Sequence, residues 1–179
     1  GNIDSGLVVG LVLGAVAVAT VAGVFIGIRR SRRKVATTQP LPHSVRDTIA
    51  RLRMLSGEYA AAGASGNRVA AEVAPEIATI AQNATELFTR LGRKGGEDQL
   101  ALGSAEYGET LRKLTAALDR DYFLDILRNP QLWDDPQERV REVRTALSDV
   151  STELVENIKQ VNARRGLHFQ VSLDGVIAS

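Results

Sequence analysis

The sequence has no cysteine, and aromatic residues make up only 4% of its 179 residues. The absence of cysteine excludes disulfide bonds, cysteine-ligated zinc and a thiol nucleophile. With so few aromatic residues, any core must be built mainly from Leu, Val, Ile and Ala. The formal net charge is only +1, so no excess of positive charge points to nucleic acid. The shares of hydrophobic and charged residues, 44% and 24%, are typical of a globular chain.

Charge is absent from residues 6–28, a run of 23 residues rich in Gly, Ala and Val. As a helix this run would be roughly 34 Å long, enough to cross a hydrocarbon core of about 30 Å. A cleaved signal peptide would have a shorter apolar region, of about 7–15 residues, with positive charge before it. Here the positive charge follows. The sequence therefore predicts a transmembrane helix over residues 6–28.

The residues that flank this run predict its orientation. The short segment before it, residues 1–5, carries only Asp4, and positive flanks stay in the cytoplasm. We therefore expect a single-pass protein of the cell membrane, with an extracytoplasmic stub at residues 1–5 and residues 29–179 in the cytoplasm. The basic flank, which could also bind anionic lipid headgroups, consists of Arg29, Arg30, Arg32, Arg33 and Lys34.

Small residues recur every fourth position in the apolar run and form two ridges. Such ridges let two helix backbones approach closely, which favours self-association or docking on another span. Glycine is common in membrane helices in any case, so a plain span is at least as good an interpretation. One ridge contains Gly6, Gly10 and Gly14, and the other contains Ala15, Ala19, Gly23 and Gly27.

A basic stop-transfer segment and linker, residues 29–42, ends in two prolines and marks a domain boundary. A cytoplasmic helical domain is expected over residues 43–179. Residues 35–179 carry 17 basic and 20 acidic side chains, which argues against a nucleic-acid partner.

Apolar residues recur at helical spacing through this domain and predict an all-α bundle of about four helices with coiled-coil-like seams. The first three are expected over residues 44–62, 68–91 and 97–127. Ser44 is the expected N-cap of the first, and Pro75 marks either a kink in the second or its true first turn. The third should stop at Asn129 and Pro130, because the residue before proline avoids the helical region.

The fourth helix has a start signal and an apolar seam. Asp135 is the expected cap, Pro136 the first helical residue and Glu138 the acid of a capping box, and Gly166 should end the helix. The seam is Val140, Val143, Leu147, Val150, Leu154, Ile158 and Val161.

The tail changes period after Gly166. Leu167, Phe169, Val171 and Leu173 alternate with polar residues, which predicts an extended segment with one apolar face. A lone strand has no sheet to join, so the tail should lie in a groove of the bundle or on a partner.

No motif of catalysis or cofactor binding is present. Neither His43 nor His168 has a second ligand at metal spacing, and the glycines of residues 91–96 lack the setting of a phosphate-binding loop. Asp119, Asp121 and Asp125, with Glu106 and Glu109 nearby, could hold Mg²⁺ or Mn²⁺. A solvated acidic face interspersed with arginines is the favoured interpretation.

Trp133, the single tryptophan, stands just before the fourth helix. It could pack against the bundle as a staple or serve as an exposed anchor for a partner. The candidate partner-binding residues are Trp133, Phe169, Val171 and Leu173.

An apolar span followed by this helical pattern resembles the XpaC-like family, named for 5-bromo-4-chloroindolyl phosphate hydrolysis and associated with TelA-type toxic-anion resistance proteins. The resemblance covers roughly residues 68–176, and it departs from the family where Tyr122-Phe123 replaces paired tyrosines. It implies a membrane-bound accessory in envelope stress with a helical, TelA-like partner. Its cues are Tyr107, Leu111, Leu114, Tyr122, Asn157, Asn162, Val171, Leu173 and Asp174.

Two functions from different classes therefore remain. The favoured hypothesis is a membrane-anchored scaffold or adaptor without enzymatic activity or cofactor, which recruits a protein partner. The alternative is a divalent-metal-dependent phosphohydrolase that uses the acidic cluster.

Overall fold

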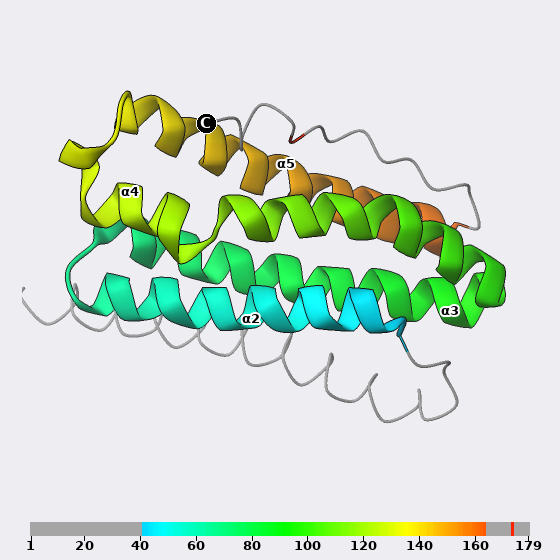
Figure 1. Ribbon diagram of the computed structural model, residues 1–179. Helices are drawn as coiled ribbons and strands as arrows, with labels where there is room; N and C mark the ends of the chain where they lie inside the picture. The colour runs from blue at the N-terminus through cyan, green and yellow to red at the C-terminus, as the bar shows by residue number, and fades with distance from the viewer. Residues whose placement is uncertain (1–40, 164–172, 174–179) are drawn as a thin grey trace, which may run out of the picture. The chain divides into compact units, whose positions relative to one another are not determined.

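A computed structural model describes residues 41–163 and Leu173 of the chain (Figure 1). These residues fall in the second of two units, Gly1–Thr38 and Gln39–Ser179. The predicted span over residues 6–28 and its basic flank, from Arg29 to Lys34, lie outside the described residues. So do Gly166, Phe169 and Val171.

Three long helical elements make up most of the described chain: α2 (His43–Ala64), α3 (Arg68–Ala117) and α5 (Pro136–Asn162). Between α3 and α5 lie three short elements, the π-helix η1 (Arg120–Leu124), α4 (Asp125–Arg128) and the 3-10 helix η2 (Pro130–Leu132). No strand occurs among residues 41–163, so the all-helical prediction is confirmed for this part of the chain.

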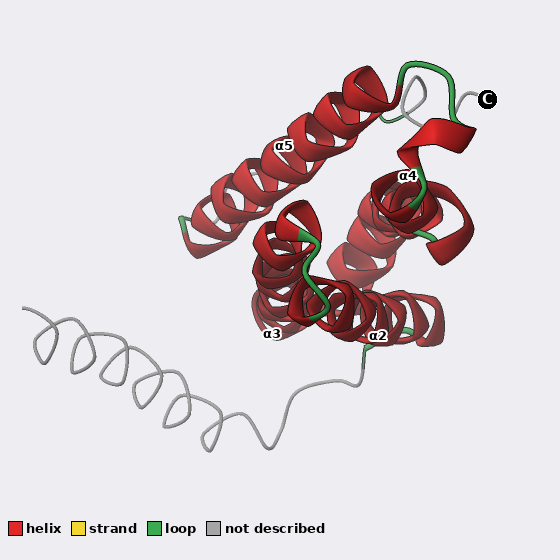
Figure 2. Cartoon of the chain, turned by 90° about the vertical axis from the view of Figure 1, so that its left-hand side faces the viewer, coloured by secondary structure: helices red, strands yellow, loops and turns green. Residues whose placement is uncertain are grey.

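The helix α3 consists of two arms, residues 68–95 and 97–117, which meet at Gly96. Gly96 has φ 71° and ψ −167°, a conformation open essentially to glycine alone. The chain reverses there, so the two arms lie side by side (Figures 1 and 2). The break predicted from the glycines of residues 91–96 is therefore confirmed, a few residues later than expected.

Contacts between elements show how the helices pack. The Ser56 hydroxyl of α2 donates to the carbonyl oxygen of Ala74 in the first arm of α3, at 2.9 Å. The Tyr107 hydroxyl of the second arm donates to the carbonyl oxygen of Val150 in α5, at 3.3 Å. Arg144 of α5 pairs with Glu72 of the first arm at 2.9 Å. Both arms therefore touch α5, and one apolar core fills the space between the helices.

The core is built mostly from aliphatic side chains, as the composition predicts. The few aromatic side chains in the core are large and fully buried. Burial raises the pKa of the Tyr59 and Tyr107 hydroxyls far above the ordinary value for tyrosine. Its largest fully buried members are Tyr59, Tyr107, Phe88, Phe123, Leu52, Leu55, Ile77, Ile80, Leu87, Leu111, Leu114 and Leu118.

The predicted starts of the first two helices need correction. Ser44 is not the N-cap, because α2 begins at His43 after Pro42, which has no side-chain acceptor. Pro75 is not in a first turn, because Asn67 caps α3 and its side-chain oxygen accepts from the amide of Ala70 at 3.0 Å. Pro75 is instead an exposed residue within the helix.

The predicted third helix over residues 97–127 is interrupted. The second arm ends at Ala117, and η1 and α4 follow as separate elements. Asp119 causes the break, since it has extended backbone (φ −54°, ψ 147°) and its side chain caps η1. The stop at Asn129 and Pro130 is confirmed, because α4 ends at Arg128.

The fourth helix begins at Pro136 as predicted, but the capping box is wrong. Asp135 has a left-handed conformation with φ 51°, and its side chain makes no capping hydrogen bond. Glu138 pairs with Arg141 at 2.5 Å. Most of the predicted seam is buried, with Val140 and Ile158 partly so, and the fully buried Asn157 was missed.

No helix within the described residues is long and apolar enough to cross a membrane. The predicted transmembrane helix over residues 6–28 therefore stays a prediction.

Two glycines of α2 give a matched test of the packing at the turn into α3. A Cβ added at Gly63 would lie 2.6 Å from the Cα of Ala71, whereas one at Gly57 has nothing within 4 Å. We expect Gly63→Ala to lower the free energy of unfolding by about 1–3 kcal/mol, because the backbone of α3 must shift. Gly57→Ala should raise it by about 0.5–1 kcal/mol through helix propensity. Urea denaturation measures both, and equal effects would contradict the close approach.

Candidate functional site

The polar residues singled out from the sequence gather at the end of the bundle where α3 gives way to α5. We call residues 118–135 the connector. It contains Asp119, Asp121, Asp125 and Trp133, four of the residues on which the two functional hypotheses depend. Glu106 and Glu109 lie on the second arm of α3, before the connector.

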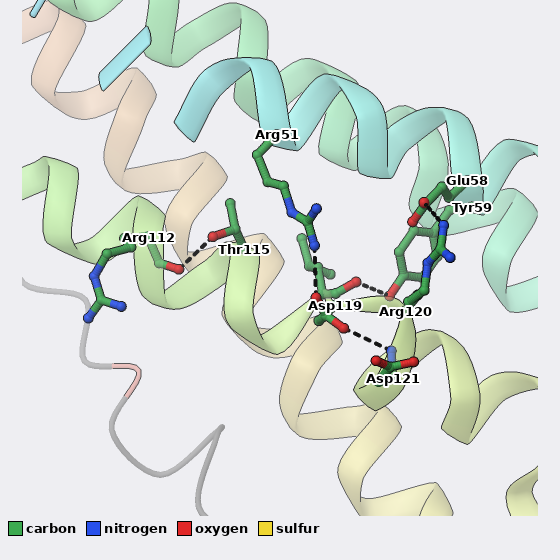
Figure 3. A network of polar contacts seen from close by, with 9 residues as sticks. Arg51, Glu58, Tyr59, Arg112, Thr115, Asp119, Arg120 and Asp121 are labelled. Carbon is green, nitrogen blue, oxygen red and sulfur yellow. Dashed lines mark hydrogen bonds and ion pairs between the residues drawn. The ribbon is translucent and has the colours of Figure 1, made fainter. Parts of the chain in front are cut away.

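Asp119 joins α2 to the connector (Figure 3). One carboxylate oxygen, Oδ2, lies 2.8 Å from Nη2 of Arg51, and the other, Oδ1, accepts from the amide of Asp121 at 2.9 Å. Both oxygens therefore have partners within the chain. Their role is to pair with α2 and to start the π-helix η1.

A second ion pair and a buried tyrosine lie beside this contact. Arg120 donates to Glu58 of α2 at 2.7 Å, and the Tyr59 hydroxyl donates to the carbonyl oxygen of Leu118 at 2.8 Å (Figure 3). Tyr59 also packs against Phe123, with 5.8 Å between the ring centroids. Burial, with the negative charges of Glu58 and Asp119, raises the pKa of the Tyr59 hydroxyl, so this donor stays protonated.

Asn67, in the turn between α2 and α3, holds the far part of the connector. Its Nδ2 donates to the carbonyl oxygen of Leu127 at 2.8 Å, while its Oδ1 caps α3. The Asn67 side chain thus hydrogen-bonds to backbone groups at the start of α3 and in α4. Asn67 was not predicted from the sequence, although asparagine just before an apolar helical pattern is a capping signal.

Asp125 is the acceptor at the centre of the α4–η2 segment. Its Oδ1 accepts from Nδ2 of Asn129 at 2.8 Å and its Oδ2 from the indole nitrogen of Trp133 at 2.9 Å. The hydrogen bonds from Asn129 and then Trp133 lower the pKa of the Asp125 carboxyl below its ordinary value.

Trp133 is half-buried and packs within its own chain. Its ring meets Tyr122 edge-on, with 5.6 Å between centroids and an interplanar angle of 85°. The guanidinium of Arg139, in the first turns of α5, lies 5.8 Å from the ring centroid and donates to the carbonyl oxygen of Asp134 at 2.8 Å. This arrangement favours the packed interpretation of Trp133 and leaves its role in binding a partner as a prediction.

The acidic cluster is not assembled as a metal site. Among residues 41–163 and Leu173, no group of three or more potential metal ligands comes together. Asp119 and Asp125 bind other parts of the fold, and Glu109 pairs with Arg112 at 2.6 Å. The spacing suggested a shared face, but the π-helix changes the angular relation between these carboxylates.

The other predicted partner-binding residues divide into two groups. Phe169 and Val171 lie outside the described residues. Leu173 is 2% exposed and belongs to the core cluster, so its side chain is not on the described surface.

Leu132, which the sequence analysis did not single out, is the most exposed large apolar side chain of the described chain, at 73%. It ends η2, directly before Trp133. Its signal in the sequence was an apolar residue placed after a helix stop and outside any helical period.

No family model matches the chain, and no curated protein or solved structure is detectably similar to it.

The lowered pKa of Asp125 gives a test of the connector by pH. The folded state holds the charged carboxylate, so its stabilising effect is present above the ordinary Asp pKa of about 3.9 and is lost as the pH falls toward the lower folded value. We expect Asp125→Asn to reduce the loss of stability between pH 6 and pH 3. Urea denaturation at both values measures this. An unchanged pH dependence in Asp125→Asn would contradict the interpretation.

Proposed function

We propose that the chain is a membrane-anchored cytoplasmic scaffold or adaptor whose helical bundle recruits a protein partner through the connector. The observation that carries this proposal is Leu132, which is 73% exposed beside a fixed Trp133. Interfaces centre on apolar and aromatic anchors that become buried on binding, and Leu132 with Trp133 offers such a pair on an ordered segment.

The connector is held in place before any partner arrives. Trp133 bonds to Asp125, Asn67 bonds to Leu127, and Arg51 pairs with Asp119. Association loses free energy when side chains and loops must be ordered, so a surface that is already ordered binds more tightly for the same area. These contacts support a role in recognition for a segment that contains short helices only.

The proposed contact surface combines Leu132 with the half-buried Trp133 beside it. The sequence predicted that Leu173 would belong to the partner surface. Because Leu173 is buried, the proposed surface does not include it. The resemblance to the XpaC-like family supports a helical, TelA-like partner and a role in envelope stress or toxic-anion resistance.

The membrane anchor rests on the sequence. Residues 6–28 have the length and hydropathy of a span, and the basic flank predicts that the bundle lies in the cytoplasm. No contact within the described residues favours the phosphohydrolase alternative, because Asp119 is paired with Arg51 of α2 and Asp125 accepts from Asn129 of the connector.

A pair of arginine substitutions tests the partner surface. In the full chain in its native membrane, Leu132→Arg should lower crosslinked recovery of a TelA-like protein at least about tenfold, the effect of about 1.4 kcal/mol at an anchor residue. Met54→Arg is the matched control, because Met54 is also exposed, at 50%, but lies on α2. Recovery that is unchanged in Leu132→Arg, or equally reduced in both variants, would overturn the proposed surface.

The lack of cysteine makes the membrane orientation directly testable. Ser5→Cys lies in the predicted extracytoplasmic stub, and Ser65→Cys lies at the exposed C-cap of α2. In intact cells, a membrane-impermeant maleimide should label Ser5→Cys, and should label Ser65→Cys only after permeabilisation. The reverse pattern would show the opposite orientation, and labelling of both without permeabilisation would contradict the anchor.

A further inference from the structure

Three exposed carboxylates of the connector lie close to Trp133. Asp134 and Asp135 directly follow it in the chain, so their Cα atoms lie within about 8 Å of the Trp133 Cα. Asp121 directly precedes Tyr122, whose ring meets that of Trp133 edge-on with 5.6 Å between the centroids. We call Asp121, Asp134 and Asp135 the acidic rim, because they border the aromatic pair from both ends of the connector.

The carboxylates of the acidic rim have no partner in the described part of the chain. Within residues 41–163 and Leu173, none of the three forms an ion pair or a side-chain hydrogen bond. A carboxylate just before a helix usually caps the first amides, yet Asp135 makes no capping hydrogen bond to α5. Asp119 and Asp125, by contrast, both bind other groups of the fold. The negative charge of the rim is therefore available to a partner.

The connector as a whole is acidic. It contains five aspartates and two arginines, which gives a net charge of −3. One of these arginines, Arg120, pairs with α2 at 2.7 Å, and the other, Arg128, is exposed on α4. Arg139, just after the connector, lies over the Trp133 ring and donates to a backbone carbonyl oxygen. The excess of negative charge therefore lies on the same segment as the exposed Leu132.

We propose that the partner presents a cationic amphipathic helix to the connector. One apolar face of this helix packs against Leu132 and Trp133, and its lysines or arginines face the acidic rim. This inference rests on the proposed partner surface and adds the chemistry of what binds there. Apolar anchors supply most of the affinity of an interface, while complementary charges around them speed association and exclude wrong partners.

Other occupants fit this surface less well. Anionic lipids and nucleic acids carry negative charge, which the acidic rim repels. A second copy in a two-fold contact would place the same acidic patch against itself. An extended peptide usually binds by adding a strand to the edge of a sheet, and no strand occurs among residues 41–163. An amphipathic helix needs only an apolar contact and complementary charge, and the connector offers both.

Two synthetic peptides serve as probes. Both are Ala-based helices of about 18 residues with two leucines one turn apart, and neither contains tryptophan. One carries lysines beside the leucines and the other carries glutamates. The full chain is held in nonionic detergent micelles, where the fluorescence of Trp133, the single tryptophan, reports binding at the connector. The lysine peptide should give a saturable change, and the glutamate peptide should bind at least about tenfold more weakly.

Neutralising the acidic rim tests the role of its charge. The variant combines Asp121→Asn, Asp134→Asn and Asp135→Asn. Asparagine tolerates the left-handed conformation that residue 135 has, so the backbone of the connector is kept. This variant should bind the lysine peptide about tenfold more weakly than the unchanged chain. Raising NaCl from about 50 to about 500 mM should weaken binding to the unchanged chain and have little effect on the variant.

The matched control combines Asp47→Asn, Asp98→Asn and Asp149→Asn. These aspartates are also exposed and also lack an ion pair among the described residues, but they lie outside the connector. The control removes the same charge from the protein and should bind the lysine peptide with unchanged affinity. Equal losses in the two triple variants, equal affinities for the two peptides, or no saturable change with the lysine peptide would overturn the cationic partner.

Leu132→Gln separates this inference from the proposed surface, because it removes the apolar anchor without adding charge. It should weaken binding of the lysine peptide about fivefold or more. If Leu132→Gln loses binding and the rim variant does not, the surface stands and its cationic occupant is wrong. If the rim variant loses binding and Leu132→Gln does not, the peptide binds the carboxylates alone, which overturns the proposed surface and this inference with it.

Discussion

The structure depends on satisfying the backbone where the second arm of α3 ends. A helix end leaves carbonyl groups without partners, and burial makes each one costly. Tyr59 of α2 supplies the hydroxyl that bonds to the Leu118 carbonyl. Asp119 then starts the next element and pairs with Arg51 of the same helix. The helix α2 thus fixes the point at which the second arm of α3 ends, and the connector begins there.

The helices could be predicted from the sequence because their apolar spacing is regular. The seam of α5 and the reversal near Gly96 follow from local chemistry: a period of 3.6 residues and a glycine pair. The ends were less predictable. The capping box at Glu138 failed because Asp135 is left-handed, whereas an N-cap residue normally has extended backbone, and its side chain makes no capping hydrogen bond.

The candidate site was harder to predict because its contacts join distant residues. Asp119 and Asp125 were singled out only as possible metal ligands, and their actual partners, Arg51 and Trp133, cannot be assigned from spacing alone. A π-helix is rare and has no strong sequence signal, so the carboxylates of Asp119, Asp121 and Asp125 were placed on a regular helix. Leu132 does not belong to the apolar spacing of any helix, so the sequence did not predict a role for it. For the same reason it does not face the core, and it is exposed.

The placement of α2 has a mechanical consequence. Its C-terminal half contacts the connector through Glu58 and Tyr59, while its N-terminal end lies at the opposite end of the bundle (Figure 1). Tension applied between the residues before α2 and the connector would therefore act along the helix axes. In this shearing direction many side-chain contacts must break together, whereas pulling the helices apart sideways would break them one at a time. Tension in this direction would therefore be shared by many contacts of the bundle.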